Sequence, residues 1–562
     1  MLTWEEKDGR FFVYGKGMVY LKCKSAVGAR VGSDAVRHEG RECFSFSSNF
    51  LSAVADLLTD VLENESQIRS VLNSIESHAE ACRRALQIIE EQSEGSPIPP
   101  WDSILDHLQA VAVNAMCVPG LRGLCLFDEQ GAGKTVMTLA AFDTLKESDQ
   151  ADAMIVVCPK SMAKEWESDC NRFLKEKYHI TLTEGDVSEK FCQVTKESDI
   201  LVINFDGISR LRVAIEARAA KCRTVLAVDE SFYVKNPDAL RSDAVRSLRD
   251  KCCKAFVLCG TPAPNSPLDL VNQFDIADNG FTFRGFKPSG DLEKDRPRLV
   301  EAIESRGLYL RRLKTTILPE LPEKQFSILP VQLSGRQAQI YQEARDNLVL
   351  WLRGMDSRAF KKNVAGYFAK RQTLLQICAC PSVIDPLFTE LPAKYTVLDN
   401  LLDDLIICQE KKVVLWSFYR RSLDEVAERY GKFGLVRVDG TTPGKDRRES
   451  IKRFQADQEV RLFLGNPAAA GAGITLHAAA DAVYLSYPGQ AAHYLQSLDR
   501  IHRRGQTASD IRYHLLVCSG TVEEGEVRRL RRKEIEQHDL LGDDVSWPSS
   551  IDDALADLET CF

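Results

Sequence analysis

The residue pattern with the clearest chemical meaning is D-E-Q-G-A-G-K-T, residues 128–135. A short apolar run precedes it, and an apolar, Ala-rich run follows. Strand, glycine-bearing turn and helix, in this order, place backbone N–H groups and a helix N-terminus around a phosphate. Lys134 would reach the β- and γ-phosphates of a nucleotide, and the Thr135 hydroxyl would bind Mg²⁺. The nucleotide-binding residues predicted in this stretch are Asp128, Glu129, Gly131, Ala132, Gly133, Lys134 and Thr135.

The match to the full phosphate-loop pattern is partial. The pattern G-x-x-x-x-G-K-[ST] has a glycine where this chain has Asp128. The alternative interpretation is a glycine-bearing turn with a solvated lysine. Because the motif alone leaves both open, the other motifs of the chain have to decide between them.

An acidic pair, Asp229 and Glu230, follows the apolar run V-L-A-V. Charged residues at the carboxyl end of a buried parallel strand lie in the crevice where ligands bind. Asp229 could hold Mg²⁺ directly or through a water, while Glu230 deprotonates the water that attacks a nucleoside triphosphate. An ordinary solvated loop is the alternative. The nucleotide interpretation is favoured because the pair and Lys134 fall in the same predicted lobe.

A second charged segment, Q-S-L-D-R-I-H-R-R-G-Q, spans residues 496–506. If it is helical, Gln496, Arg500 and Arg503 lie on one face. Two arginines directed at a triphosphate from a separate lobe would act as arginine fingers, which contribute about 10³–10⁵ in rate. A surface helix with ordinary arginines is the alternative.

The elements that position these residues can be inferred from the apolar runs. Two series of short β-branched runs separated by helical stretches predict parallel strands with crossover helices. We therefore predict an α/β protein with two parallel-sheet lobes, a helical insert between them and a small α+β N-terminal region. The predicted regions are an accessory region at 1–95, a first lobe at 96–330, a helical insert at 331–390, a second lobe at 391–540 and an acidic tail at 541–562.

Composition excludes some classes of protein. The formal charge of −8 argues against coating of nucleic acid by bulk charge, although local basic stretches exist. No apolar run approaches the roughly 18–20 residues of a membrane span, so no membrane association is expected. The 17 cysteines are scattered without a C-x-x-C pair, which favours reduced thiols in a cytoplasmic protein over a zinc ribbon.

Further short motifs occur along the chain in a defined order. They are H-L-Q-A-V with Gln109, V-V-C-P-K-S-M-A-K-E-W ending at Trp166, V-I-N-F-D at Asn204, V-D-E-S-F-Y-V-K-N-P with Lys235, L-C-G-T-P-A-P-N with Gly260 and Asn265, L-R-R-L-K at Arg311, V-V-L-W-S-F at Ser417, V-D-G-T-T-P at Asp439, A-A-G-A-G-I-T-L at Gly471 and Gly473, and G-T-V-E-E at Gly520. With the loop, the acidic pair and the arginine segment, this ordered set resembles the Swi/Snf-type ATPases of helicase superfamily two. The resemblance covers roughly residues 100–535 and implies two RecA-like lobes. That family usually carries D-E-x-G-x-G-K-T, so Asp128 no longer counts against nucleotide binding.

The resemblance implies roles for individual residues. Gln109 matches the residue that reads the adenine edge, which implies ATP with Mg²⁺, and Gly473 is placed with the nucleotide-binding residues. Arg500 and Arg503 match the paired finger positions. Small hydroxyl and amide groups at the expected nucleic-acid contacts suit phosphates rather than base edges, which implies sequence-independent binding. Those predicted contacts are Pro159, Lys160, Ser161, Trp166, Gly260, Thr261, Ser417, Gly471 and Thr475.

The sequence departs from the family at three places. Ser231 and Phe232 replace the common Ala-His after the acidic pair, so a histidine link between the ATP and DNA sites is absent. Ala470 and Thr475 replace the usual glycine and asparagine of the glycine-rich loop, and Tyr487-Pro488 is what remains of a Trp-Asn-Pro. These departures concern the coupling between the ATP and DNA sites and the contacts with DNA, rather than ATP binding.

The expected function is a DNA-stimulated ATPase that translocates on double-stranded DNA. A strand-separating helicase or motor of a restriction-like complex is one alternative, and an ATP-dependent switch or scaffold with slow hydrolysis is another. The short insert resembles compact bacterial or phage-defence relatives, which would place the protein in the cytoplasm at the nucleoid. Since no nuclease constellation is evident, cleavage or modification would need a partner such as a nuclease or methyltransferase. The acidic tail is expected to be solvated, with docking or autoinhibition as alternatives.

Overall fold

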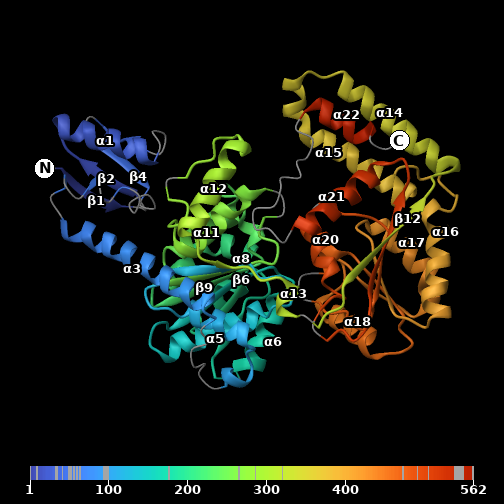
Figure 1. Ribbon diagram of the computed structural model, residues 1–562, viewed down its shortest axis with the longest axis horizontal. Coiled ribbons are helices and arrows are strands. Elements are labelled where there is room, and N and C mark those ends of the chain that lie inside the picture. Colours follow the sequence, from blue (N-terminus) through green and yellow to red (C-terminus); the bar gives the residue numbers. More distant parts are fainter. Residues whose placement is uncertain are drawn as a thin grey trace. The chain divides into compact units, whose positions relative to one another are not determined.

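The computed structural model divides into two compact units, Met1–Leu313 and Lys314–Phe562, which are described separately (Figure 1). The boundary falls earlier than the predicted residue 330, because the strand that follows it belongs to the sheet of the second unit. The described residues are 2–7, 10–31, 36–40, 42–47, 54, 57–58, 61–62, 65–92, 100–174, 177–263, 266–284, 286–318, 320–470, 474–489, 491–503, 505–536 and 550–559.

The N-terminal region is a small α+β element, as predicted. Its described strands form an antiparallel sheet in the order β1-β2-β4-β3. Alternation along the strands directs Phe11, Val13, Phe44 and Phe46 into one core with residues of α1, because side chains on a strand point to opposite faces in turn. The elements are β1 (Thr3–Lys7), β2 (Arg10–Tyr14), α1 (Gly17–Val31), β3 (Arg37–His38) and β4 (Cys43–Ser47).

The long helix α3 (Glu65–Glu90) connects this region to the rest of the first unit. Its C-terminal half packs on α4 (His107–Met116), and Ala81 and Ala85 are buried in the core that also contains residues of the parallel sheet. His78 accepts a hydrogen bond from the Arg122 N–H at 3.1 Å. The end of α3 is therefore part of the first lobe, so a cut near residue 95 would expose core surface.

Seven parallel strands form the sheet of the first unit over its described residues, in the order β11-β5-β10-β9-β6-β8-β7. Continuous apolar runs produce strands buried on both faces, as expected for a parallel sheet covered by crossover helices. The remaining elements of this unit are β5 (Gly123–Leu126), α5 (Lys134–Glu147), β6 (Ala153–Cys158), α6 (Ala163–Leu174), β7 (Ile180–Leu182), α7 (Val187–Thr195), β8 (Ile200–Asn204), α8 (Phe205–Arg210), α9 (Arg212–Ala219), β9 (Thr224–Asp229), η4 (Ser231–Val234), α10 (Leu240–Arg249), β10 (Lys254–Leu258), η5 (Pro267–Leu270), α11 (Val271–Asp278), α12 (Leu292–Arg306) and β11 (Tyr309–Leu310), with η3 (Trp101–Ser103) before α4.

The described part of the second unit contains a six-stranded parallel sheet in the order β12-β17-β16-β13-β15-β14. Two parallel-sheet lobes are thus confirmed. Its elements are α13 (Lys314–Ile317), β12 (Lys324–Val331), α14 (Gly335–Arg353), α15 (Ser357–Ala379), η6 (Pro381–Val383), α16 (Ala393–Leu402), η7 (Asp403–Cys408), β13 (Val413–Trp416), α17 (Arg420–Tyr430), η8 (Gly431–Phe433), β14 (Leu435–Val438), α18 (Gly444–Ala456), β15 (Leu462–Gly465), α19 (Pro467–Ala470), β16 (Asp481–Tyr484), α20 (Ala491–Leu498), β17 (Ile511–Cys518), α21 (Val522–Glu536) and α22 (Ile551–Glu559). None of the helices among the described residues is long and apolar enough to cross a membrane.

The predicted helical insert corresponds to α14 and α15, and the end of the chain packs on them. Ala554 and Leu558 of α22 are fully buried in the core of this unit, and the Asp557 carboxylate accepts hydrogen bonds from Arg371 and Tyr367, both at 2.7 Å. The expectation of a solvated tail is therefore wrong for residues 550–559. Acidic residues suggested solvation, but apolar residues at helical spacing bury one face of the helix.

Candidate active site

The candidate site of the first unit lies where neighbouring parallel strands end. β10 pairs with β5 on one side and with β9 on the other, and Leu258 is in register with both Leu126 and Asp229. The loop at residues 128–133 follows β5, and the acidic pair ends β9. Because carboxyl ends of parallel strands meet at one edge, the topology brings together the two motifs that the sequence predicted to cooperate.

The loop before α5 has the backbone that phosphate binding needs. Gly131 and Gly133 have φ angles of 92° and 83°, in the left-handed region that favours glycine, and Gly133 caps α5. The Lys134 ammonium donates to the carbonyl oxygens of Asp128 at 2.7 Å and Glu129 at 3.1 Å. A phosphate at the N-terminus of α5 would offer Lys134 a charged acceptor in place of these carbonyls, and the Thr135 side chain is partly exposed beside it.

The Asp128 side chain has another role than the predicted one. It is fully buried and forms an ion pair with Arg312, whose backbone N–H also donates to Asp128 Oδ1 at 2.8 Å. Arg312 additionally donates to the carbonyl oxygen of Leu108. The carboxylate is therefore committed to Arg312, and only the backbone of Asp128 takes part in the loop.

Gln109 joins α4 to the same loop. Its side-chain carbonyl accepts from the Asp106 N–H at 3.1 Å, closing a capping box, and its amide donates to the Ala132 carbonyl at 3.0 Å. A Cβ added to Gly133 would lie 2.3 Å from Gln109 Nε2, so this glycine is required for the close approach. The predicted adenine contact stays a prediction, but the side chain lies against the nucleotide loop as that role requires.

The acidic pair is buried, and its environment is asymmetric. Burial raises the pKa of Asp229, while a hydrogen bond from Trp166 Nε1 at 2.8 Å and the charge of Lys134 act in the opposite direction. Glu230 has a φ of 50° and accepts from Gln130 Nε2 at 3.1 Å. A desolvated carboxylate beside Lys134 is an environment that a divalent cation would stabilise, which fits the predicted Mg²⁺ site.

Several predicted nucleic-acid contacts in the first unit are buried instead. Trp166 is 1% exposed and binds Asp229, so it positions the acidic pair. Gly260 packs against Gln130, and Thr261 is 7% exposed with a hydroxyl that has no hydrogen-bond partner among the described residues. Pro159 is also buried. Lys160 and Ser161 remain exposed and available.

The residues that replace Ala-His after the acidic pair form their own contacts. The fully buried Ser231 hydroxyl donates to Gln273 Oε1 at 2.5 Å, and the Gln273 amide donates to the Pro262 carbonyl at 2.6 Å. The Phe232 ring contacts the ring of Tyr233 in a tilted arrangement, with ring centroids 4.5 Å apart. Hydrogen bonds thus connect Ser231, the residue after the acidic pair, to the loop after β10 without a histidine.

In the second unit, the predicted arginines converge although the predicted helix does not include them. α20 ends at Leu498, so Gln496, Arg500 and Arg503 do not share one helical face. Arg500 is 3% exposed, and both guanidinium groups donate to the carbonyl of Ile474, at 3.4 Å and 3.3 Å. The turns after α20 therefore gather the pair. Gly471 and Gly473, just before Ile474, lie outside the described residues.

The two other predicted nucleic-acid contacts of the second unit differ in exposure. Ser417 is fully buried and hydrogen bonds with Ser422 at 3.0 Å and Ser486 at 3.1 Å, so it fastens the ends of β13 and β16 to α17 and cannot reach a ligand. Thr475 is partly exposed, and its carbonyl accepts from Gln455 at 2.6 Å. Only Thr475 keeps the predicted accessibility.

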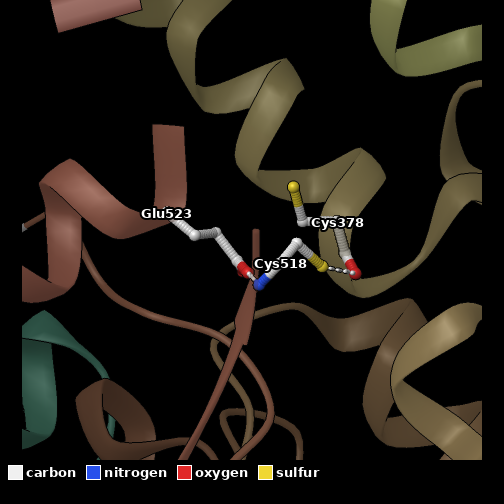
Figure 2. A group of neighbouring side chains, drawn as sticks. All are labelled: Cys378, Cys518 and Glu523. Atoms are coloured by element: carbon white, nitrogen blue, oxygen red, sulfur yellow. Dashed lines mark hydrogen bonds between the residues drawn. The ribbon is translucent and has the colours of Figure 1, made fainter. Parts of the chain in front are cut away.

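A cluster of potential metal ligands lies elsewhere in the second unit. Ligand atoms of Cys378, Cys518 and Glu523 lie within 4.8 Å of one another, and Figure 2 shows the Glu523 carboxylate directed at the Cys518 backbone and the Cys518 thiol at the Cys378 carbonyl. Both carboxylate oxygens are used, since the other accepts from the buried Lys394 ammonium at 2.6 Å. Burial raises the pKa of the Cys518 thiol well above its ordinary value. With an ammonium on its carboxylate and a Cys518 thiol that burial keeps protonated, the cluster does not fit a metal ion.

Comparison with known proteins assigns a family to both units. Residues 106–383 match the SNF2-related domain, and residues 393–505 match the helicase conserved C-terminal domain. The chain is similar to a Caenorhabditis elegans homolog of the SWI/SNF-related matrix-associated actin-dependent regulator of chromatin subfamily A-like protein 1, with 25% identity over 69% of this chain and 55% of the relative. It is also similar to an uncharacterized ATP-dependent helicase of Mycoplasma genitalium, with 25% identity over 76% of this chain and 41% of the relative.

A solved structure is similar as well. It is the Sulfolobus solfataricus SWI2/SNF2 ATPase core in complex with double-stranded DNA, with 21% identity over 83% of this chain and 97% of that chain and a TM-score of 0.35. The chain spans about half the length, or less, of the two curated relatives named above.

Proposed function

Because this chain belongs to the Swi/Snf-like ATPases of helicase superfamily two, we propose that it hydrolyses ATP and uses the reaction to translocate on double-stranded DNA. The observation that carries the proposal is that the loop before Lys134 and the pair Asp229–Glu230 follow the carboxyl ends of β5 and β9, the two strands that flank β10. Conversion of binding into hydrolysis needs a phosphate-binding lysine, a metal-binding carboxylate and a base, and these three occur together.

The first unit supplies the groups that bind ATP and start its hydrolysis. Lys134 would leave the loop carbonyls and bind the β- and γ-phosphates, while Thr135 and Asp229 would hold Mg²⁺, which would neutralise the charge that develops on the phosphates. Glu230 accepts the proton of the attacking water. Gln130, bonded to Glu230, holds the orientation of that carboxylate.

The second unit supplies positive charge in this proposal. Arg500 and Arg503 share the Ile474 carbonyl, a neutral acceptor that a triphosphate would outcompete electrostatically. Hydrolysis would then need both units, which makes lobe motion and chemistry mutually dependent. That dependence is what a translocase requires and what a simple nucleotide-binding protein does not.

Double-stranded DNA is the proposed track. The family model, and the similarity to a relative named for chromatin, support DNA as the partner. The exposed Lys160 and Ser161 suit phosphate contacts rather than base edges, which favours sequence-independent binding. In the second unit, the partly exposed Thr475 is the predicted DNA contact that a phosphate could reach, among the residues that the structure describes.

Two assays, ATP turnover and strand displacement, separate the alternatives. A strand-separating helicase or restriction-like motor would share the ATP site, whereas a switch or scaffold would show slow turnover. The similarity to a Mycoplasma helicase supports a bacterial DNA-processing setting. We extend the proposal to a role in phage defence, a nuclease or methyltransferase partner, and a cytoplasmic, nucleoid-associated location.

The test is ATP turnover by the full chain with duplex DNA, single-stranded DNA and RNA, followed by a strand-displacement assay. We expect duplex DNA to raise turnover several-fold. Lys134→Ala should bind ATP poorly, and Glu230→Gln should bind ATP without hydrolysing it. Lys146→Ala, in the last turn of the same helix α5, is the matched control and should keep turnover. Equal turnover with and without every nucleic acid would refute the translocase.

A further inference from the structure

The chain passes from the first unit to the second between Leu313 and Lys314. Residues 311–314, which we call the crossover segment, belong to the motif L-R-R-L-K, to which the sequence assigned no role. Side chains on both sides of this boundary are bonded to candidate catalytic segments, each inside its own unit. The proposed function uses none of these side chains.

On the side of the first unit, the crossover segment is bonded to the start of the nucleotide loop. Arg312 pairs with the fully buried Asp128, its N–H donates to the same carboxylate, and the Glu129 N–H donates to the Arg312 carbonyl at 3.1 Å. Arg311 donates to the Phe127 carbonyl at 2.6 Å. The carbonyls of Asp128 and Glu129 are the two acceptors of Lys134, so a change in the contacts of Lys134 acts on residues that hold Arg312.

On the side of the second unit, Lys314 is bonded to the segment that carries the arginine pair. It is 4% exposed, forms an ion pair with Asp499 and donates to the His502 carbonyl at 2.9 Å. Asp499 directly precedes Arg500, and His502 directly precedes Arg503. The position of Lys314 therefore fixes the backbone from which both guanidinium groups extend.

We propose that Arg312 and Lys314 are positioning residues that transmit the occupancy of the nucleotide loop to the Arg500–Arg503 pair. The two residues are separated by one other, so their Cα atoms can be at most about 7 Å apart, and the chain between them cannot absorb a displacement by stretching. Movement of Asp128 and Glu129 is passed along the backbone to the segment held by Lys314. The inference rests on the proposed function, because it assumes that the arginine pair serves ATP hydrolysis.

Two pairs of substitutions test it without leaving a buried charge unpaired. Asp128→Gly with Arg312→Met removes the contact to the loop and restores the glycine of the common phosphate-loop pattern. Lys314→Met with Asp499→Leu removes the contact to the arginine segment. Lys394→Met with Glu523→Leu removes a fully buried pair outside the crossover segment and is the matched control. If the first pair does not fold, Arg312→Lys keeps the charge and loses the forked geometry.

The measurements are DNA-stimulated kcat, KM for ATP, and hydrogen exchange of the amides of residues 499–503 with and without a non-hydrolysable ATP analogue. We expect each crossover pair to lower kcat at least tenfold with a much smaller change in KM, and to abolish the exchange response that the unaltered chain shows. All four changes together should lower kcat no more than either pair alone, since the two pairs interrupt the same path.

If the fold-decreases in kcat of the two pairs multiply in the four-residue variant, the inference is overturned. An intact exchange response in either crossover pair would overturn it as well. Loss of that response in the control pair as well would also overturn it, because the effect would then reflect general destabilisation. Absence of DNA-stimulated turnover in the unaltered chain would instead refute the proposed function. The exchange response to the ATP analogue separates these failures, because it does not need hydrolysis.

Discussion

Replacement of Trp166 by phenylalanine should raise the Mg²⁺ concentration that ATP turnover requires, although the ring is too deeply buried to touch a ligand. The indole N–H donates to Asp229 Oδ2 at 2.8 Å, and phenylalanine keeps most of the ring but has no donor. Partners that orient a metal-binding carboxylate typically contribute about 10–100-fold to metal affinity or activity. A charged hydrogen bond worth about 1.5–3 kcal/mol predicts a similar range. We therefore expect the half-saturating Mg²⁺ concentration to rise at least tenfold.

The chain offers a matched control for this experiment. Trp101 is also 1% exposed, and its N–H donates to Asp143 Oδ2 at 2.7 Å, away from the strand ends that carry the acidic pair. Trp101→Phe removes the same atoms and the same kind of bond, so it reports the cost of the cavity and of a lost indole–carboxylate hydrogen bond away from the acidic pair. ATP turnover would be titrated with Mg²⁺ in both variants at saturating DNA. If Trp166→Phe shows the same Mg²⁺ dependence as Trp101→Phe, the assignment of Trp166 as a positioning residue is wrong.

Three further predictions follow from single side chains. Lys394→Met should lower the free energy of unfolding of the second unit by about 3–5 kcal/mol in a denaturant titration, because it leaves the Glu523 carboxylate buried and unpaired; adding Glu523→Leu should restore most of the loss. Burial opposes ionisation of Asp439, but hydrogen bonds from Thr441 and the charge of a neighbouring arginine outweigh it and lower its pKa to about 2. Since the folded pKa is below the ordinary value of 3.8, Asp439 contributes about 2 kcal/mol above pH 4 and loses it as the pH falls toward 2, so the stability difference from Asp439→Asn should shrink over that window. Ser417→Ala should leave DNA affinity unchanged, whereas Lys160→Ala should lower it and reduce its dependence on salt concentration, as measured by fluorescence anisotropy.

The sequence predicted what depends on strand order and local backbone. Two series of β-branched runs are enough to predict two parallel sheets, and Gly131 and Gly133 mark the turn because only glycine adopts their φ angles without cost. The ends of parallel strands must share one edge. The approach of Lys134 to the acidic pair therefore followed from motif order alone.

The direction of individual side chains could not be predicted from the sequence. Trp166, Thr261 and Ser417 were predicted to contact DNA because they lie in the right motifs, yet each is buried within its unit. A motif fixes the neighbourhood of a residue, whereas the pleat and the helix phase decide whether its side chain faces solvent or a neighbouring strand.

Helix length was also misjudged for the arginine segment. The spacing of Gln496, Arg500 and Arg503 suits a helix, but α20 ends at Leu498. A tertiary contact competes with the helix, because Asp499 forms an ion pair with Lys314, while the Arg500 N–H bonds to the Ser497 carbonyl in a local turn. Lys314 is far away in the sequence, so no local pattern could reveal its contact with Asp499. The arginines still meet, at a backbone carbonyl rather than along a helical face.

Asp128 connects the nucleotide loop to a segment that is distant in the sequence. The common loop pattern has a glycine at this place. The backbone does not require one here, because Asp128, unlike Gly131 and Gly133, is not among the described residues with a positive φ angle. A side chain is therefore permitted, and a carboxylate at the end of a buried strand needs a cation. Arg312 provides it from the last residues of the first unit. An aspartate at this position thus converts the start of the nucleotide loop into an attachment point for the segment that leads to the second unit, which a glycine could not do.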